Sequence, residues 1–154
     1  MSEKVLFTDI ELLYRPDRKY YDLEITENGD LKHDNSFDTG LNLALATDGR
    51  ADVSEVSRPE QQRGTIVDLF TDRRNGSKLW LIEQSRNDNS AVNRAIDYAR
   101  NALKYFVDFN YVKEIKVTGI RTADGIQLNI NVFGLNGIVD RYKYNAWENS
   151  IYKQ

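Results

Sequence analysis

The feature that most constrains the fold of this chain is a run near its C-terminal end, in residues 126–132, where every second side chain is apolar. Isoleucine, leucine and valine alternate there with glutamine and asparagine, which is typical of a strand that buries one face. Asp124-Gly125 precedes this run and Asn136-Gly137 follows it, and both pairs are strong hairpin-turn signals. The sequence therefore predicts a C-terminal three-stranded antiparallel meander.

The turn at Asn136-Gly137 leaves two registers open for the strand that follows it. A two-residue loop places Tyr142 and Tyr144 on the face opposite to the apolar run, so that the sheet has a tyrosine-rich outer surface. A loop that is longer by one residue places both tyrosines on the apolar face. A tyrosine-rich outer surface would suit a protein partner.

The strongest helix prediction starts after Asn89 or Ser90, either of which can cap a helix N-terminus. Apolar side chains then recur at helical spacing from Val92 to Val107, and charged side chains occupy the other side. Each large buried side chain contributes about 1.5–3 kcal/mol, against a few tenths for an exposed ion pair. Burial of the apolar stripe is therefore expected to hold this helix in place.

A second helix is predicted earlier in the chain, over residues 57–74. Ser57 and Glu60 have the spacing of a capping box, and Asn75-Gly76 is typical of a helix end. Ile66 and Phe70 belong to its apolar stripe. Between the two helices, residues 79–82 form a short apolar patch that is either helical or irregular.

The N-terminal part is predicted to form two β-hairpins, in residues 22–31 and 42–53. In each, alternating apolar side chains lead into a turn pair, Asn28-Gly29 or Asp48-Gly49. The fold class is therefore α+β, with N-terminal β-hairpins, two main α-helices and the C-terminal meander. Residues 1–20 are expected to be an N-terminal arm or edge strand, residues 21–148 a single domain, and residues 149–154 a C-terminal tail.

Composition and charge exclude several classes of function. The chain has no cysteine, which removes disulfides, thiol nucleophiles and Cys-based metal sites and fits folding in a reducing cytoplasm. No apolar run approaches the ~18 residues of a membrane span, and the net charge of −3 gives no general attraction to nucleic acid. Residues 1–58 contain 7 basic and 13 acidic residues, against 14 and 11 in residues 59–154, an asymmetry that can orient a subunit against its neighbours.

Candidate catalytic residues are few, and no cofactor or metal is expected. His33, beside Asp30 and Asp34, lacks a spaced set of metal ligands and is interpreted as a solvated loop histidine. Glu114-Ile115-Lys116 has the E-x-K pattern of metal-dependent nucleases, with Asp108 as the nearest further acid. Glu83, after an apolar run, is the best candidate for a glycosidase acid. None of these patterns is specific, so we expect no enzyme.

Four segments, none of them specific alone, occur in a recognisable order and spacing. They are Leu69-Phe70-Thr71-Asp72-Arg73-Arg74, Gly76-Ser77-Lys78-Leu79-Trp80-Leu81, Tyr98-Ala99-Arg100-Asn101-Ala102-Leu103 and Tyr142-Lys143-Tyr144-Asn145-Ala146-Trp147-Glu148. In these segments the chain resembles the baseplate wedge proteins of contractile-tailed bacteriophages, in the Mu-like branch of the sheath-initiator family. One departure is that Glu114-Ile115-Lys116 lacks the proline of the Glu-Pro-Arg motif found in the wider family, so contacts of that motif are not carried over.

The resemblance implies structural work in a virion. Members of the family join a helical bundle of wedge subunits around the tail tube, and their C-terminal β-region takes up strands of the first sheath ring. The implied partners are other baseplate wedge proteins, the tail sheath protein and, as a further possibility, the tail tube or hub. The implied assembly is six-fold and hetero-oligomeric, formed in the bacterial host cytoplasm, without nucleic acid or membrane as a partner.

The resemblance also implies two interfaces. The wedge-partner interface is expected at Glu60, Arg63, Ile66, Val67, Phe70, Arg73 and Arg74. The sheath interface is expected at Ile130, Val132, Val139, Arg141, Tyr142, Lys143 and Tyr144. The alternatives are a tail-associated cell-wall glycosidase, a metal-dependent nuclease, and a regulatory binding module outside any virion.

Overall fold

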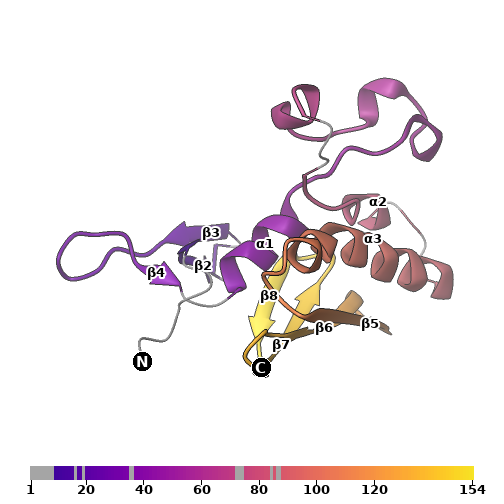
Figure 1. Cartoon of the computed structure of the whole chain (residues 1–154). Coiled ribbons are helices and arrows are strands. Elements are labelled where there is room, and N and C mark those ends of the chain that lie inside the picture. Colours follow the sequence, from indigo (N-terminus) through magenta and orange to yellow (C-terminus); the bar gives the residue numbers. More distant parts are fainter. Residues whose placement is uncertain are drawn as a thin grey trace.

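The structure is a computed structural model that describes residues 9–15, 17–18, 20–34, 37–71, 75–83, 85 and 88–154. Its centre is a four-stranded antiparallel sheet, and α1 (Asp38–Ala46) and α3 (Asn89–Asp108) pack on one face of that sheet (Figure 1). Within the described part of the chain, no helix is long and apolar enough to cross a membrane. The predicted α+β class is confirmed.

The C-terminal sheet extends the predicted meander by one strand. Its strands are β5 (Glu114–Thr122), β6 (Gly125–Phe133), β7 (Val139–Asn145) and β8 (Ser150–Lys153), in that spatial order. Residues 150–153, expected in a C-terminal tail, form β8 because the chain reverses after β7. Oδ1 of Asn145 accepts the N–H of Trp147 at 2.9 Å and the N–H of Glu148 at 3.3 Å, as is typical of an Asx turn.

The register between β6 and β7 is the one with the longer loop. Tyr142 lies opposite Ile130 and Tyr144 opposite Leu128, so both tyrosines point to the apolar face. The loop of residues 134–138 is closed by a hydrogen bond from the N–H of Gly134 to the carbonyl of Ile138 at 2.8 Å. The alternative of a tyrosine-rich outer surface is therefore wrong.

The long helix is confirmed almost to the residue. α3 begins at Asn89, and its cap is Asp88, whose carboxylate accepts the N–H of Ala91 at 2.8 Å. The alanine, leucine and phenylalanine side chains of its apolar stripe are buried against the sheet. The cap thus lies one residue before the predicted Asn89, because it is the Asp88 carboxylate that accepts a free N–H of the first helical turn.

The second predicted N-terminal hairpin, residues 42–53, is wrong, because α1 occupies residues 38–46. Leu41 and Leu45 are four residues apart and both are buried, whereas Leu43 between them is half exposed. Three leucines at every second position fit a strand, but two of them also fit one face of a helix. Packing of that face against α3 and the sheet decided in favour of the helix.

The helix predicted over residues 57–74 is also wrong. The chain there forms short 3-10 turns, η1 (Val53–Glu55), η2 (Pro59–Gln61) and η3 (Ile66–Leu69). Arg63 and the glycine after it adopt positive φ angles of 49° and 102°, which a right-handed helix does not accommodate. The apolar side chains of this segment are also exposed and do not pack against the core. Most helical stability in proteins comes from packing of an apolar face, so a helix here would lack that stabilisation.

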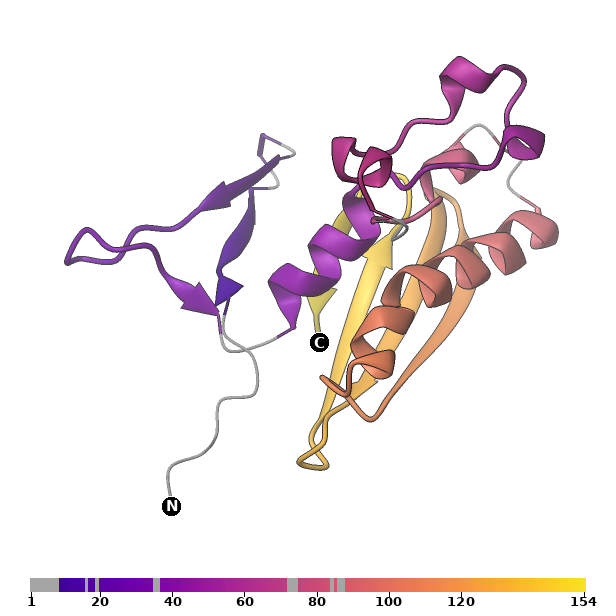
Figure 2. The same ribbon diagram turned by 45° about the horizontal axis from the view of Figure 1, so that its top comes forward.

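The N-terminal part forms small antiparallel ribbons, whose strands pair with one another and not with the strands of the central sheet (Figure 2). In them β1 (Asp9–Ile10) pairs with β4 (His33–Asp34), and β2 (Leu12–Arg15) pairs with β3 (Tyr20–Leu23). The predicted turn at Asn28-Gly29 is confirmed by the bridge from Ile25 to Leu31. Residues 9–15, expected in an arm or edge strand, supply β1 and β2.

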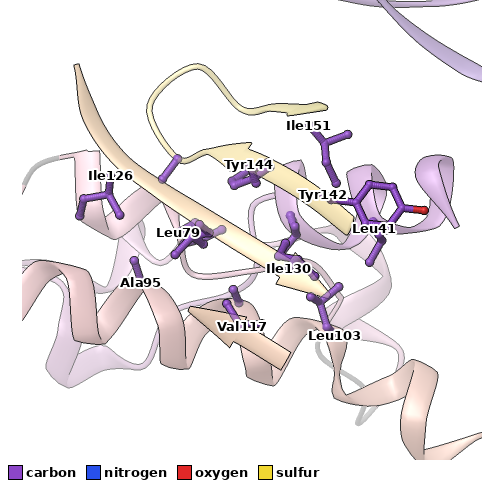
Figure 3. Packing of buried hydrophobic residues seen from close by; sticks show 14 of the residues in the cluster. Leu41, Leu79, Ala95, Leu103, Val117, Ile126, Ile130, Tyr142, Tyr144 and Ile151 are labelled. Carbon is purple, nitrogen blue, oxygen red and sulfur yellow. The ribbon is translucent and has the colours of Figure 1, made fainter. Parts of the chain in front are cut away.

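The core lies between the helices and one face of the sheet (Figure 3). Ile130 and Tyr144 project from the strands into this core. Leu79, which precedes the short helix α2 (Trp80–Glu83), belongs to the same buried cluster. Each such side chain contributes about 1.5–3 kcal/mol when fully buried. Because the core is one-sided, the opposite face of the sheet carries no covering element among the described residues.

Candidate interaction surfaces

The outer side of β5 is a free strand edge, since no described strand pairs with β5 except β6. The guanidinium of Arg100 donates to the carbonyl oxygen of Val117 at 3.1 Å, so the main-chain groups of Val117 face away from β6. Backbone groups alternate between the two sides of an antiparallel strand. Those of Ile115 and Gly119 therefore point to the same outer side, where an added strand could pair with them.

The opposite edge of the sheet is closed. The N–H of Ile151 in β8 donates to the hydroxyl oxygen of Tyr21 at 3.2 Å, and α1 packs beside β8. Tyr21 belongs to the N-terminal ribbon, so that ribbon occupies the place that an added strand would take. The free edge of β5 is thus the longer accessible edge of this sheet.

The face of the sheet that α1 and α3 leave uncovered is here named the bare face (Figures 1 and 2). Its central rows are polar: Asn131 lies opposite Arg141, and Asn129 lies opposite Lys143. Lys116 joins them from β5, with Nζ 3.6 Å from the carboxylate of Glu114 and 5.0 Å from the ring centre of Phe133. The bare face is therefore mostly polar and basic, with apolar side chains at its margins.

The expected sheath residues separate into two groups. The side chains of Ile130, Val132, Tyr142 and Tyr144 are buried in the core, and β6 is paired on both sides, so a partner cannot reach them. Burial raises the pKa of the Tyr144 phenol well above its usual range. Val139, Arg141 and Lys143 lie together on the bare face, where a partner can contact them.

A second surface is formed by residues 65–70, here named the apolar turn. Ile66 is 73% exposed and Phe70 is 81% exposed, with Val67 and Leu69 also open to solvent. Four large apolar side chains in one short exposed turn are unusual for a free surface and typical of a contact site. These residues were predicted to lie on a helix, but they cluster because they share one short turn.

Asp68 holds the apolar turn in shape. Its carboxylate accepts the N–H of Thr65 at 2.6 Å and the N–H of Asn75 at 3.1 Å. Partial desolvation would raise the pKa of Asp68, but these backbone hydrogen bonds outweigh it and hold the pKa below its ordinary value. The fixed turn keeps the apolar side chains outside instead of letting them collapse onto the core.

The expected wedge residues are only partly brought together. Ile66, Val67 and Phe70 share the apolar turn, and Glu60 is exposed in η2. Arg63 instead has internal partners: its guanidinium donates to Asp48 at 2.8 Å and lies 4.5 Å from the ring centre of Trp80. The other two expected residues, Arg73 and Arg74, lie outside the described residues.

A cleft of about 650 Å³ lies beside the C-terminal halves of α1 and α3. Leu43 lines one side, and Tyr105 and Phe109 line the other. Tyr105 contacts Phe109 with ring centres 4.6 Å apart and Tyr111 with ring centres 5.8 Å apart. The lining is mainly apolar, and Asp108 and Lys104 at its rim form an ion pair at 3.7 Å.

The candidate catalytic residues do not converge. Glu83 is exposed at the end of α2, whereas a glycosidase acid needs an apolar pocket. His33 is exposed in β4 opposite Ile10, and Glu114 is exposed beside Lys116. Over the residues that the structure describes, no group of three or more His, Asp or Glu side chains could hold a metal ion.

The chain is similar to known phage proteins over most of its length. A family described as phage protein GP46 matches residues 37–138, from the residue before α1 to the loop before β7. Baseplate protein gp46 of Escherichia phage Mu is 28% identical over 148 residues, which are 94% of this chain and 99% of that relative. The resemblance to Mu-like phage baseplate proteins is thereby confirmed, and the chain belongs to the GP46 family of phage proteins.

Proposed function

We propose that the chain is a structural subunit of a phage tail baseplate, which links the wedge to the first ring of the tail sheath. Its Mu relative is named a baseplate protein and matches 94% of this chain. The geometry that carries the proposal is the presence of two separate accessible surfaces, the free edge of β5 and the apolar turn. A connector needs two such surfaces, and it needs no catalytic group.

The sheath side of the connector is the sheet. A strand from a sheath subunit pairs with the outer main-chain groups of Ile115 and Gly119, as in other cases of β-strand addition. Val139, Arg141 and Lys143 act on the neighbouring bare face. Ile130, Val132, Tyr142 and Tyr144 contribute only by holding the sheet together, because their side chains are internal.

The wedge side is the apolar turn. Ile66, Val67 and Phe70 dock into a bundle of other baseplate wedge proteins, with Glu60 at the margin. Burying such side chains stabilises a complex by about 1.5–3 kcal/mol each before the costs of association. The assembly is a six-fold hetero-oligomer in the virion, which is put together in the host cytoplasm. The tail tube or hub is a further proposed partner.

A proline in β5 tests the sheath contact. Ile115→Pro removes an outward N–H without removing a hydrogen bond to β6, because the main-chain groups of Ile115 face outward. Ile115→Ala is the matched control, since it loses similar side-chain packing but keeps the N–H. Tails assembled with the proline variant are expected to carry baseplates without sheath, and tails with the alanine variant to carry both.

Electron microscopy of tails assembled with each variant shows whether sheath is attached to the baseplate. Sheath assembly of equal length on both variants would exclude strand addition at β5. Loss of baseplates from both would show that the substitution acts on folding, and the circular dichroism of the purified chains identifies that case separately.

A further inference from the structure

The N-terminal ribbon ends in a projection, residues 22–32, here named the acidic arm. The N–H of Thr26 donates to the carbonyl of Asp30 at 2.8 Å, and Gly29 donates back to Thr26 at 2.9 Å, which closes the tip. Ile25 pairs with Leu31 behind the tip, yet Ile25 is 65% exposed. The arm extends away from the central sheet in both views (Figures 1 and 2).

The arm combines negative charge with apolar side chains. Residues 22–32 contain four acidic residues and one basic residue, and the basic one, Lys32, contacts Glu24 at 2.9 Å and Glu11 at 3.2 Å. Those contacts raise the pKa of Lys32 above its ordinary value. Glu27 and Asp30 at the tip stay exposed. A two-stranded ribbon of this kind is marginally stable alone, so a covering surface would stabilise it.

The bare face of the sheet has the complementary chemistry. Lys116, Arg141 and Lys143 lie on it, with Glu114 as the one acid on β5, β6 and β7 that shares the face. Within the described part of the chain, neither Arg141 nor Lys143 forms an ion pair. Ile120 is 51% exposed at the margin, so the face also offers apolar contact.

We infer that the acidic arm of one copy docks on the bare face of a second copy of this chain. Opposite charges on two surfaces steer association and fix its orientation, and the apolar side chains of both surfaces are then covered. The arm and the face are different surfaces, so the contact is heterologous and builds a ring or a chain of copies. The contact leaves the outer edge of β5 open, but it uses Arg141 and Lys143, which the proposed sheath contact also uses, so the arm and the sheath compete for this part of the bare face.

Cysteine cross-linking tests the contact directly, because the natural chain has no cysteine. Asn28→Cys places a thiol at the tip of the arm, and Thr118→Cys places one on the bare face, in the row of Asn129 and Lys143. Mixing the two single variants under mild oxidation is expected to give a disulfide-linked dimer of full-length chains. Lys104→Cys, on the exposed side of α3, is the matched control and is expected to give none with Asn28→Cys.

Charge reversal then tests the chemistry of the same contact. Lys143→Glu in the Thr118→Cys chain is expected to reduce the cross-linked fraction about tenfold, since like charges in contact cost more than 1.4 kcal/mol. Combining it with Glu27→Lys in the Asn28→Cys chain is expected to restore the cross-link.

The inference is overturned if Asn28→Cys and Thr118→Cys give no disulfide both as concentrated free chains and in assembled tails. It is equally overturned if position 118 cross-links to a different protein in tails, because that protein would then be the occupant. Failure of Lys143→Glu to weaken the cross-link would contradict the role of charge.

Discussion

The hydroxyl of Tyr21 donates a hydrogen bond of 2.6 Å to Oδ1 of Asn42, a residue of α1 whose side chain is buried. The same oxygen accepts the N–H of Ile151 at 3.2 Å and lies 3.1 Å from the carbonyl of Asn149. One hydroxyl thus joins β3, α1 and β8, which are far apart along the chain. This tie holds the N-terminal ribbon against the sheet and closes the β8 edge.

Removing that hydroxyl is expected to destabilise the fold. Tyr21→Phe leaves the buried Oδ1 of Asn42 without its donor, which costs about 1–3 kcal/mol. Tyr20→Phe is the control, because the hydroxyl of Tyr20 accepts a hydrogen bond from the exposed Arg18 at 3.1 Å, and loss of this surface contact should cost less than about 0.5 kcal/mol. Urea unfolding of the two variants measures the difference, and equal midpoints would mean that Tyr21 is not a tie.

Gly76 is expected to tolerate no side chain. Its φ is +81°, and an added Cβ would lie 2.3 Å from the carbonyl oxygen of Thr47. Gly137 has a similar φ of +83° with open space around it, so Gly137→Ala should cost only the backbone strain of about 1–2 kcal/mol. Gly76→Ala should cost about 3 kcal/mol or more, because the contact between Thr47 and Ser77 must also open.

Thermal unfolding followed by circular dichroism compares the two glycine variants. A smaller loss of stability for Gly76→Ala than for Gly137→Ala would contradict the close approach of residues 47 and 76.

Local patterns predicted those parts of the fold in which they have one physical interpretation. In α3, the apolar stripe runs for several turns, and only a helix can bury it. In β6, strict alternation between turn pairs leaves only a half-buried strand. Leu41, Leu43 and Leu45 allow two interpretations, and only tertiary packing of Leu41 and Leu45 selects the helix.

The candidate surfaces were harder to predict, because exposure depends on the whole fold. A shift of one residue in the turn before β7 moves Tyr142 and Tyr144 from the surface to the core. The apolar side chains of the turn at Ile66 and Phe70 are equally consistent with burial until the surrounding chain is seen. Residue type alone therefore predicted four sheath-interface residues, Ile130, Val132, Tyr142 and Tyr144, whose side chains the fold buries.

Lys78 is expected to hold the segment around η1 to the body of the protein. Its Nζ lies 2.8 Å from the carboxylate of Asp52 and 2.6 Å from that of Glu55. Lys78→Met should cost about 1.5–3 kcal/mol, as for hydrogen bonds to charged groups. Lys104→Met breaks the exposed pair with Asp108 and should cost less than about 1 kcal/mol.

The contribution of Lys78 should disappear at high pH. Burial lowers the pKa of Lys78, but the hydrogen bonds that its ammonium donates to the two carboxylates outweigh burial and raise the pKa above its ordinary 10.5. A raised pKa means that the stabilisation is complete below pH 10.5 and is lost as the pH rises through the folded value. The difference in unfolding free energy between the natural chain and Lys78→Met should therefore shrink above that pH. A constant difference would exclude the ion pair as its cause.

Phe70→Ser is expected to separate binding from stability on the wedge side. The side chain of Phe70 is exposed, so its loss should change the free energy of unfolding by less than about 0.5 kcal/mol. Co-purification with the other baseplate proteins should nevertheless fall, since a buried aromatic anchor in an interface is typically worth about 2 kcal/mol or more. Ile138→Ser is the matched control, because Ile138 is also exposed but lies in the loop before β7.

The pair of variants distinguishes a specific contact from general loss of surface hydrophobicity. If Phe70→Ser and Ile138→Ser lower co-purification equally, the apolar turn has no special role. If Phe70→Ser alone unfolds the chain, Phe70 is part of the fold and not of a surface. Loss of partners by Phe70→Ser alone, with an unchanged unfolding curve, is the result that assigns the wedge contact to residues 65–70, because no folded-state contact then remains to explain the exposed aromatic ring.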